Sequence, residues 1–307
     1  MSKTAFIFPG QGSQKVGMLA EMGELTVVRQ TFQEASGALG YDLWELIQQG
    51  PAEALNQTDK TQPALLVSGV ALWRLWEQRA GRRPDMLAGH SLGEYTALVC
   101  AGVVSLGDAA RLVRARGEFM QAAVPAGTGA MAAILALEDD KVATACEQAQ
   151  QGEVVSPVNF NAPGQVVIAG SSDAVARAIE LCKQAGGKAM PLPVSVPSHC
   201  ALMKPAAEEL AAMMQDMNFH APEIPVINNV DVTEQKDVAQ IRDALVRQLY
   251  SPVRWVETVQ ALSEAGVTKL YECGPGKVLA GLVKRIDRSL PVAAMDNTEA
   301  FEQALTA

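Results

Sequence analysis

The chain has 307 residues, 49% hydrophobic and 19% charged, a composition that suits a large globular core and excludes a disordered protein. Its formal net charge of −9 argues against nucleic acid or an acidic membrane surface as the main partner. Five scattered cysteines without a C-x-x-C pair indicate neither a disulfide framework nor a zinc site. Because the sequence has neither a membrane-span pattern nor a signal-peptide pattern, we expect a cytoplasmic protein.

The first predicted element is a short buried strand, Thr4–Phe8, followed by the glycine-containing loop Pro9–Gln14. The glycine spacing fits neither a dinucleotide fingerprint nor a P-loop, and no Lys-Ser or Lys-Thr pair follows. A phosphate-binding loop is therefore the weaker interpretation. We favour a loop whose backbone N–H groups can approach a reacting centre because glycine has no side chain.

Helical periodicity then predicts three helices before the second strand. The third of them is long, and we expect its proline, Pro63, to lie in the first turn. The predicted helices are Val27–Leu39, Tyr41–Gln49 and a segment that begins at Thr61 and ends before Gly81.

The pentapeptide Gly89-His90-Ser91-Leu92-Gly93 follows the apolar strand Met86–Ala88 and precedes a helix predicted at Leu92–Ala101. A strand, a G-x-S-x-G sequence and a helix together form a nucleophile elbow. Glycine on both sides of the serine avoids clashes in so tight a turn. The helix N-terminus offers free N–H groups to a developing negative charge, so the segment predicts a catalytic serine, Ser91.

The helix predicted at Leu106–Ala123 has a charged residue in its apolar face. Arg116 is four residues from both Leu112 and Met120, and no acidic residue shares this face. An unpaired buried charge is energetically expensive. Either Arg116 reaches solvent or a distant carboxylate, or its partner is an anionic ligand that the guanidinium binds in a bidentate manner. The opposite face is polar, with Arg111, Arg114, Glu118 and Gln121.

After the hinge-like segment Pro125–Gly129, the predicted elements follow the order β-α-β-β-α-β, which is typical of a ferredoxin-like unit. We expect residues 127–197 to form this small subdomain, inserted into a larger subdomain of residues 1–126 and 198–307. Its predicted elements are the strand Met131–Leu137, the helix Asp139–Gln150, the strands Val154–Phe160 and Gln165–Ala169, the helix Ser172–Ala185 and the strand Lys188–Val194.

Strands and helices alternate again beyond the small subdomain, which predicts an α/β fold with a parallel sheet covered on both faces. Reactive groups gather at the carboxyl ends of such strands, where Ser91 and the loop at Gln11 both fall. The predicted elements are the helix Ala201–Met217, the strand Pro225–Asn228, the helices Val238–Leu249 and Val256–Ala265, the strand Lys269–Glu272 and a closing helix, Lys277–Arg288.

A serine hydroxyl needs a base within hydrogen-bond reach, and the chain has three histidines. His90 lies inside the elbow, where we expect its side chain to point away from the serine and to shape the turn. His220 lies in a segment typical of a surface loop. His199 follows Ser91 in the order that elbow enzymes use, so by elimination it is the predicted base.

Five separated motifs, in this order and spacing, resemble those of bacterial malonyl-CoA:acyl carrier protein transacylases of type II fatty acid synthesis. The resemblance extends from the first strand to the last helix and implies an α/β-hydrolase-like core with a parallel sheet plus an inserted ferredoxin-like subdomain. The motifs are Phe8–Gln14, Gly89–Glu94, Arg116-Gly117, Val196–His199 and Gly274-Pro275-Gly276.

The resemblance implies that Ser91 accepts the acyl group, that His199 is the general base and that Arg116 holds the free carboxylate of the malonyl group. It also implies an oxyanion hole made by the backbone N–H groups of Gln11 and Leu92.

Supporting roles implied by the resemblance are less direct. The main-chain carbonyl in the region of Gln248 would orient the histidine, although spacing alone leaves open an acid such as Asp173. Asn159 matches a polar residue near the histidine.

The resemblance implies an enzyme that transfers the malonyl group from malonyl-CoA to the phosphopantetheine thiol of the carrier protein, with ping-pong kinetics. It implies no metal or redox cofactor. We expect the enzyme to be a monomer. A thioesterase-type serine hydrolase and a non-catalytic binding module are the alternatives; a cation at Arg116 favours malonyl over a neutral chain. The carrier is acidic in this family, so basic residues are candidates for its docking: Lys188, Lys204, Lys277, Lys284, Arg285 and Arg288.

Overall fold

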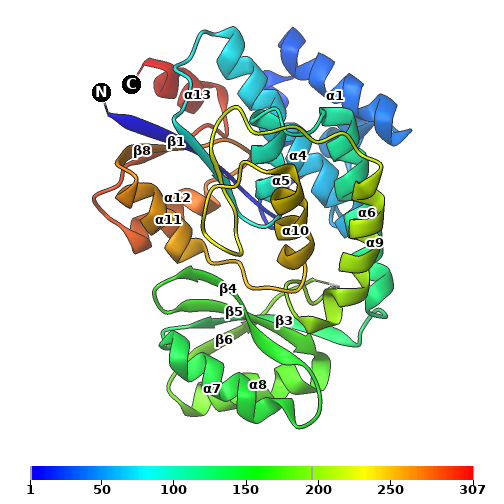
Figure 1. Ribbon diagram of the computed structural model, residues 1–307, viewed down its shortest axis with the longest axis vertical. Helices are drawn as coiled ribbons and strands as arrows, with labels where there is room; N and C mark the ends of the chain where they lie inside the picture. The colour runs from blue at the N-terminus through cyan, green and yellow to red at the C-terminus, as the bar shows by residue number, and fades with distance from the viewer. Residues whose placement is uncertain (1, 195, 307) are drawn as a thin grey trace.

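The computed structural model describes residues 2–194 and 196–306, and within these residues the strands form two sheets. A parallel sheet has the order β7-β2-β1-β8-β9, and an antiparallel sheet has the order β4-β5-β3-β6 (Figure 1). The strands are β1 (Lys3–Phe8), β2 (Met86–Gly89), β3 (Gly129–Leu135), β4 (Val155–Ala162), β5 (Gln165–Ser171), β6 (Lys188–Pro191), β7 (Val226–Ile227), β8 (Val267–Glu272) and β9 (Val292–Ala294).

Helices cover the parallel sheet and one side of the antiparallel sheet, as Figure 1 shows. They are α1 (Thr26–Leu39), α2 (Leu43–Gln49), α3 (Ala52–Leu55), α4 (Thr58–Gln78), α5 (Leu92–Cys100), α6 (Leu106–Ala123), α7 (Asp139–Gln150), α8 (Ser172–Gln184), α9 (Lys204–Gln215), α10 (Val238–Gln248), α11 (Trp255–Glu264), α12 (Val278–Ile286) and α13 (Thr298–Thr306). Short 3-10 helices lie at Ala20–Met22 and Ala201–Met203.

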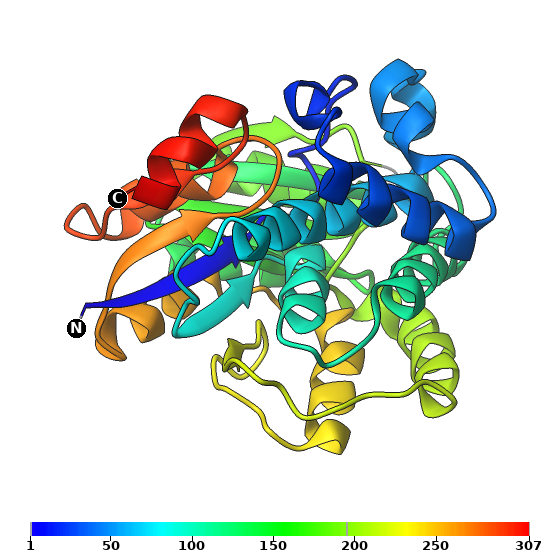
Figure 2. The ribbon, with the colours of Figure 1, turned by 90° about the horizontal axis from the view of Figure 1, so that it is seen from above.

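β1 lies at the centre of the parallel sheet, between β2 and β8 (Figure 2). Because successive side chains of a strand point to opposite faces, its apolar residues enter two different cores. Phe6 and Phe8 pack into the core beneath α4, α5 and α6, whereas Ala5 and Ile7 pack into the core beneath α11 and α12. The confirmed fold class is therefore α/β, with a parallel sheet covered on both faces.

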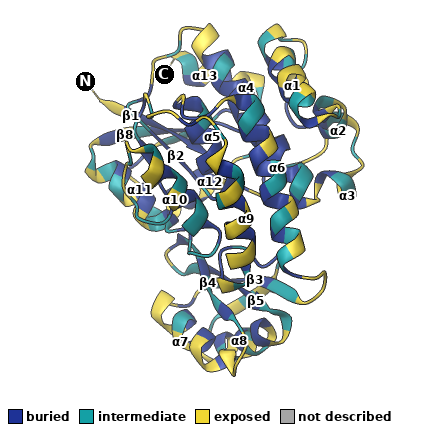
Figure 3. Ribbon diagram, turned by 45° about the vertical axis from the view of Figure 1, so that its right-hand side comes forward, coloured by how far each residue is buried: buried dark blue, intermediate teal, exposed yellow. Residues whose placement is uncertain are grey.

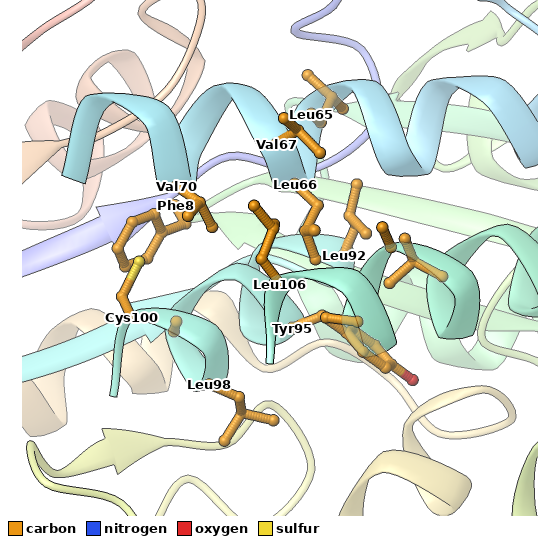
Figure 4. Close-up of a cluster of buried hydrophobic side chains, with 14 of the residues drawn as sticks. Phe8, Leu65, Leu66, Val67, Val70, Leu92, Tyr95, Leu98, Cys100 and Leu106 are labelled. Carbon is orange, nitrogen blue, oxygen red and sulfur yellow. The ribbon is translucent and has the colours of Figure 1, made fainter. Parts of the chain in front are cut away.

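The helix that follows the serine, α5, is packed firmly against α4. Leu92 and Tyr95 of α5 lie in the same cluster as Leu66 and Val70 of α4 (Figure 4). Burial of one such leucine side chain contributes about 2 kcal/mol to stability. The helices approach so closely that a Cβ at Gly69 would lie 2.7 Å from the Thr96 side chain. This packing fixes the position of α5 against α4.

The antiparallel sheet confirms the ferredoxin-like arrangement predicted from the element order. β3 lies between β5 and β6, and β4 pairs with the other edge of β5. α7 has the bounds that the sequence predicted, and it packs with α8 on this sheet to enclose a separate core. β3 and β5, in the middle of the sheet, are mostly buried, whereas the edge strand β6 has no buried residue and the outer faces of α7 and α8 are exposed (Figure 3).

Two predicted helix starts are wrong. α4 begins at Thr58, so Pro63 lies in its second turn and not its first. The polar residues at 58–60 concealed this turn, and Pro63 lacks the N–H that would bond the Asp59 carbonyl. The helix predicted from Ala201 is divided into a 3-10 turn and α9, which starts at Lys204. Pro205 then falls in the first turn of α9, where no intrahelical N–H is needed.

The prediction that the helix after Gly276 closes the fold is also wrong. α12 is followed by β9 and α13, and β9 pairs in parallel with β8 at the sheet edge. β9 has three residues, too few to give a hydrophobic alternation. The short helix α3 was likewise not predicted. No helix in the described residues combines the length and apolar character that crossing a membrane requires.

Candidate active site

Ser91 lies in a sharp turn between β2 and α5, with a φ of 52° and a ψ of −108° that non-glycine residues rarely adopt. The turn is possible because its flanking residues have no Cβ. A Cβ at Gly89 would lie 1.9 Å from the carbonyl carbon of Gly93, and one at Gly93 would lie 2.0 Å from the Phe8 carbonyl oxygen. The strand, turn and helix thus have the geometry of a nucleophile elbow.

Gly93→Ala is expected to lower the free energy of unfolding by about 3 kcal/mol, because the added methyl group collides with the β1 backbone and not with a movable side chain. Urea denaturation measures the change. Gly37→Ala in the exposed face of α1 is the control, since nothing lies within 4 Å of its Cβ. That control should gain about 0.5–1 kcal/mol. A neutral Gly93→Ala would contradict the tight packing of the elbow.

Ser91 and His199 meet directly, although 108 residues separate them in the sequence. Ser91 Oγ lies 2.7 Å from His199 Nε2, and His199 Nδ1 lies 2.7 Å from the main-chain oxygen of Gln248. A carbonyl oxygen only accepts, so Nδ1 carries the proton and Nε2 is free to accept the serine proton. The group that orients the histidine is therefore a main-chain carbonyl; the alternative acid, Asp173, lies in the first turn of α8.

The imidazole of His199 is uncharged in this environment. The residue is 3% exposed, and burial, reinforced by the nearby Arg116 charge, lowers the pKa of His199 from 6.5 to about 3. A neutral imidazole at neutral pH can accept a proton as soon as the serine hydroxyl attacks a substrate.

Arg116 is completely buried beside the serine. Its Nη1 donates to Gln62 Oε1 at 2.7 Å, and its Nη2 donates to Gln248 Oε1 at 3.1 Å and lies 3.4 Å from Ser91 Oγ. In the described part of the chain no carboxylate forms an ion pair with this guanidinium, and its Nε has no hydrogen-bond partner. The charge is solvated by neutral groups: the amides of Gln62 and Gln248, the Ser91 hydroxyl and the Tyr95 ring, whose centroid lies 5.3 Å from the guanidinium carbon. It therefore remains able to attract an anion.

The glycine-containing loop after β1 lies against the elbow. The β1–β2 register pairs Phe8 with Gly89, and the N–H of His90 donates to the Phe8 carbonyl. The Gln11 side chain is fixed by a 3.1 Å hydrogen bond to Thr58 Oγ1. Leu92 opens α5, where the first N–H groups have no intrahelical acceptor. Gln11 and Leu92 thus both belong to segments that border Ser91.

The His90 side chain is hydrogen-bonded to a residue other than Ser91, as expected for a residue that shapes the turn. Its Nε2 lies 2.8 Å from Asn161 Oδ1, and its ring packs on Trp255. Asn159 instead has a buried Oδ1 that finds no hydrogen-bond partner in residues 2–194 and 196–306. His220 is exposed in a loop, as predicted.

A pocket of about 390 Å³ opens between the two sheets at Ser91 and His199. One wall is apolar, with Met131 of β3 and Leu192 just beyond β6. The other wall is polar, with Gln11 and residues near the start of α4. A thioester with a flexible arm fits such a cleft, because the reacting carbonyl requires polar donors and the arm has both apolar and amide groups.

Sequence reasoning assigned no role to three polar residues that organise the site: Gln62, Glu94 and Asn229. All three are buried, and each is hydrogen-bonded to Arg116, to Gln248 or to the backbone of Ser91. Glu94 alone had a visible signal, since an acid follows the serine by three residues in an apolar helix. Among the described residues, no group of three or more His, Cys, Asp or Glu side chains is placed to hold a metal ion.

The fold and this arrangement of serine, histidine and arginine define the class of the chain as an acyl transferase, since residues 5–297 match the acyl transferase domain family. A malonyl CoA-acyl carrier protein transacylase of Salmonella typhimurium is 61% identical over 100% of both chains. The chain therefore belongs to the malonyl CoA-acyl carrier protein transacylase family.

Solved structures agree with this assignment. An acyl carrier protein S-malonyltransferase of Vibrio cholerae is 62% identical, with a TM-score of 0.97 over 98% of this chain and 99% of that one. A malonyl-transacylase in complex with a type II PKS acyl-carrier protein is 57% identical, with a TM-score of 0.98 over 99% of both chains.

Proposed function

We propose that this protein transfers the malonyl group of malonyl-CoA to the phosphopantetheine thiol of an acyl carrier protein. The observation that carries the proposal is the position of Ser91 Oγ, 2.7 Å from the neutral His199 and 3.4 Å from Arg116, whose charge has no carboxylate partner among the described residues. A nucleophile with its base and a cation for a distal carboxylate suit a short dicarboxylic thioester.

In the first half-reaction, Ser91 Oγ attacks the thioester carbonyl while His199 Nε2 takes its proton. The carbonyl becomes an oxyanion, which the N–H groups of Gln11 and Leu92 stabilise. One such donor is typically worth about 3–4 kcal/mol in the transition state. The C–S bond then breaks, the histidine returns its proton to the leaving CoA sulfur, and a malonyl ester remains on Ser91.

In the second half-reaction, the carrier's phosphopantetheine thiol attacks the ester, and His199 takes the thiol proton. The ester C–O bond breaks and the histidine gives the proton back to Ser91 Oγ. Arg116 holds the malonyl carboxylate through both steps, so that the ester carbonyl stays directed at the oxyanion donors. The chemistry is complete without a further cofactor, because CoA belongs to the substrate.

A serine hydrolase of the thioesterase type is the alternative reading of the same elbow. The two differ in the fate of the acyl-enzyme, since a transferase ester must survive until a thiol arrives. We expect the malonyl-enzyme to persist for minutes after removal of malonyl-CoA and to discharge rapidly when holo carrier protein is added. Rapid release of free malonate without a carrier would contradict transfer.

The two-part organisation into residues 1–126 with 198–307 and residues 127–197 is also part of the proposal. It is supported by the separate core beneath α7 and α8 and by the confinement of the antiparallel strands to the segment from β3 to β6. We place the protein in the cytoplasm, as a monomer.

The carrier would dock on exposed basic residues of α12 and its flanks. Lys284 and Arg288 are exposed, whereas Arg285 donates to Gln165 and the Pro163 carbonyl, and Lys277 lies 3.8 Å from Asp296. Lys284 and Arg288 are therefore the stronger candidates. Lys204 at the start of α9 and Lys188 at the start of β6 are exposed as well.

A further inference from the structure

Glu94 is a buried carboxylate for which the reaction has no direct use. It lies in the first turn of α5 and is 2% exposed. Its Oε2 accepts two hydrogen bonds of 2.9 Å, one from the backbone N–H of Asn229 and one from the side-chain amide of Gln248. Burial of a carboxylate in a core is unfavourable, so we expect the buried Glu94 to have a function that offsets this cost.

Gln248 connects this carboxylate to the three residues of the proposed reaction. Its Nε2 donates to Glu94 and to the Ser91 carbonyl, its Oε1 accepts from Arg116, and its main-chain oxygen accepts from His199. A side-chain amide has one donor end and one acceptor end. Rotation by 180° would turn its NH₂ group toward the guanidinium and its oxygen toward the carboxylate. An ionised Glu94 excludes that orientation.

Asn229 links the same carboxylate to the elbow. Its Oδ1 accepts from the Ser91 N–H at 2.7 Å, and its Nδ2 donates to the Gly89 carbonyl at 2.6 Å. The N–H and the C=O of Ser91 are therefore hydrogen-bonded to the side-chain amides of Asn229 and Gln248, and both of these residues also donate a hydrogen bond to Glu94. The unusual φ of Ser91 needs such external support.

The charge of Glu94 complements that of Arg116 across the Gln248 amide. Burial raises the pKa of Glu94 from 4.5 to about 7, although the bonds from Asn229 and Gln248 and the Arg116 charge of α6 oppose the rise. Asp231, after β7, raises it further but is itself paired with Arg247 of α10. His199, whose Nδ1 is hydrogen-bonded to the main-chain oxygen of Gln248, has a pKa of about 3 and so stays neutral in the pH range in which Glu94 titrates.

We propose that Glu94 is a positioning residue for the substrate carboxylate: its ionised form fixes the Gln248 amide with Oε1 toward Arg116 and so sets the direction of the guanidinium. This inference rests on the proposed function, in which Arg116 binds the malonyl carboxylate. It separates two substrates, because an acetyl group has no distal carboxylate and does not depend on the direction of Arg116.

The test compares malonyl and acetyl transfer in Glu94→Ala and Glu94→Gln. Glu94→Ala is expected to lower malonyl transfer by about 10²-fold, as a misdirected substrate group does, and acetyl transfer by only a few-fold. Glu94→Gln keeps an acceptor oxygen but not the charge, so it should retain more of the malonyl preference than Glu94→Ala does. Equal losses for both substrates in Glu94→Ala would overturn the proposal, because a general structural defect lowers both alike.

Glu272→Gln is the matched control. Glu272 is also fully buried, its pKa is also raised to about 7, and it also accepts two hydrogen bonds, from the N–H groups of Leu279 and Ala280. It caps α12 and has no contact with Arg116 or Gln248 among the described residues. The control is expected to change the melting temperature and to leave the malonyl-to-acetyl ratio unchanged.

The pH dependence of the malonyl-to-acetyl ratio is a second test, which does not require Glu94→Ala to fold. In the wild type the malonyl-to-acetyl ratio should fall as the pH decreases through about 7, where Glu94 becomes protonated. In Glu94→Gln the ratio should not change with pH. A ratio independent of pH in the wild type would overturn the role of the ionised form.

Intact-mass analysis of the wild type with malonyl-CoA distinguishes failure of the proposed function from failure of the proposed role of Glu94. Absence of a malonyl adduct would contradict the proposed function itself. An adduct on the wild type, combined with a malonyl-to-acetyl ratio that Glu94→Ala leaves unchanged, would contradict only the positioning role of Glu94.

Discussion

Replacement of His199 by alanine is expected to lower malonyl transfer by about 10⁴-fold or more, with little change in stability. The imidazole is the only group at hydrogen-bond distance from Ser91 Oγ, among the described residues, that can take its proton. Removal of a nucleophile's base in serine enzymes costs rates of this order because the neutral hydroxyl barely attacks. Steady-state transfer to holo carrier protein measures the loss.

The control for this variant is His220→Ala, since His220 is exposed in a loop and should be replaceable without effect. The pH profile adds an independent check. With a pKa of about 3, His199 remains neutral at all pH values above about 5, so acetyl transfer should show no acidic limb centred near 6.5. A His199→Ala variant with more than a tenth of wild-type activity would contradict the assignment of the base.

Arg116→Ala is expected to lower malonyl transfer by about 10²–10³-fold and to leave acetyl transfer within a few-fold of the wild type. The physical reason is that truncation of one partner of a buried charge pair costs about 2–5 kcal/mol. Acetyl lacks the carboxylate, so it loses no such interaction. Parallel kcat/KM measurements with malonyl-CoA and acetyl-CoA give the two values.

Two further variants define the cause. Arg116→Lys keeps the charge but not the planar pair of donors, so it should recover only part of the malonyl activity. Arg111→Ala on the exposed face of α6, where the side chain pairs with Asp108, should change neither substrate. Equal losses of malonyl and acetyl transfer in Arg116→Ala would show that the residue supports the fold and not the substrate carboxylate.

The local parts of the site could be predicted from the sequence. The elbow at Ser91 combines glycine spacing, a preceding apolar strand and a following helix, all within about fifteen residues. Arg116 was visible because a charge interrupts a 3.6-residue apolar pattern. The structure agrees with that pattern, since Arg116 is fully buried, whereas Arg111 and Glu118 on the opposite face of α6 are exposed.

The pairing of Ser91 with His199 and the role of the Gln248 carbonyl were expected, but the side-chain contacts that span the chain could not be predicted. Gln62, Asn229 and Gln248 meet around Arg116 and Ser91, yet they come from α4, from the loop after β7 and from the end of α10. Periodicity gives the face on which a residue lies but not which residue of another element it meets. A buried glutamine in an apolar face gives a weak signal, because its amide is uncharged and its hydrogen-bond partners lie far away in the sequence.

The most direct test of the account is the mass of the protein after brief incubation with malonyl-CoA and removal of the excess. The account predicts that the wild type gains one malonyl group, that peptide mapping locates it on Ser91, and that Ser91→Ala gains none. A malonyl group on another residue, or an equal mass gain in Ser91→Ala, would contradict it.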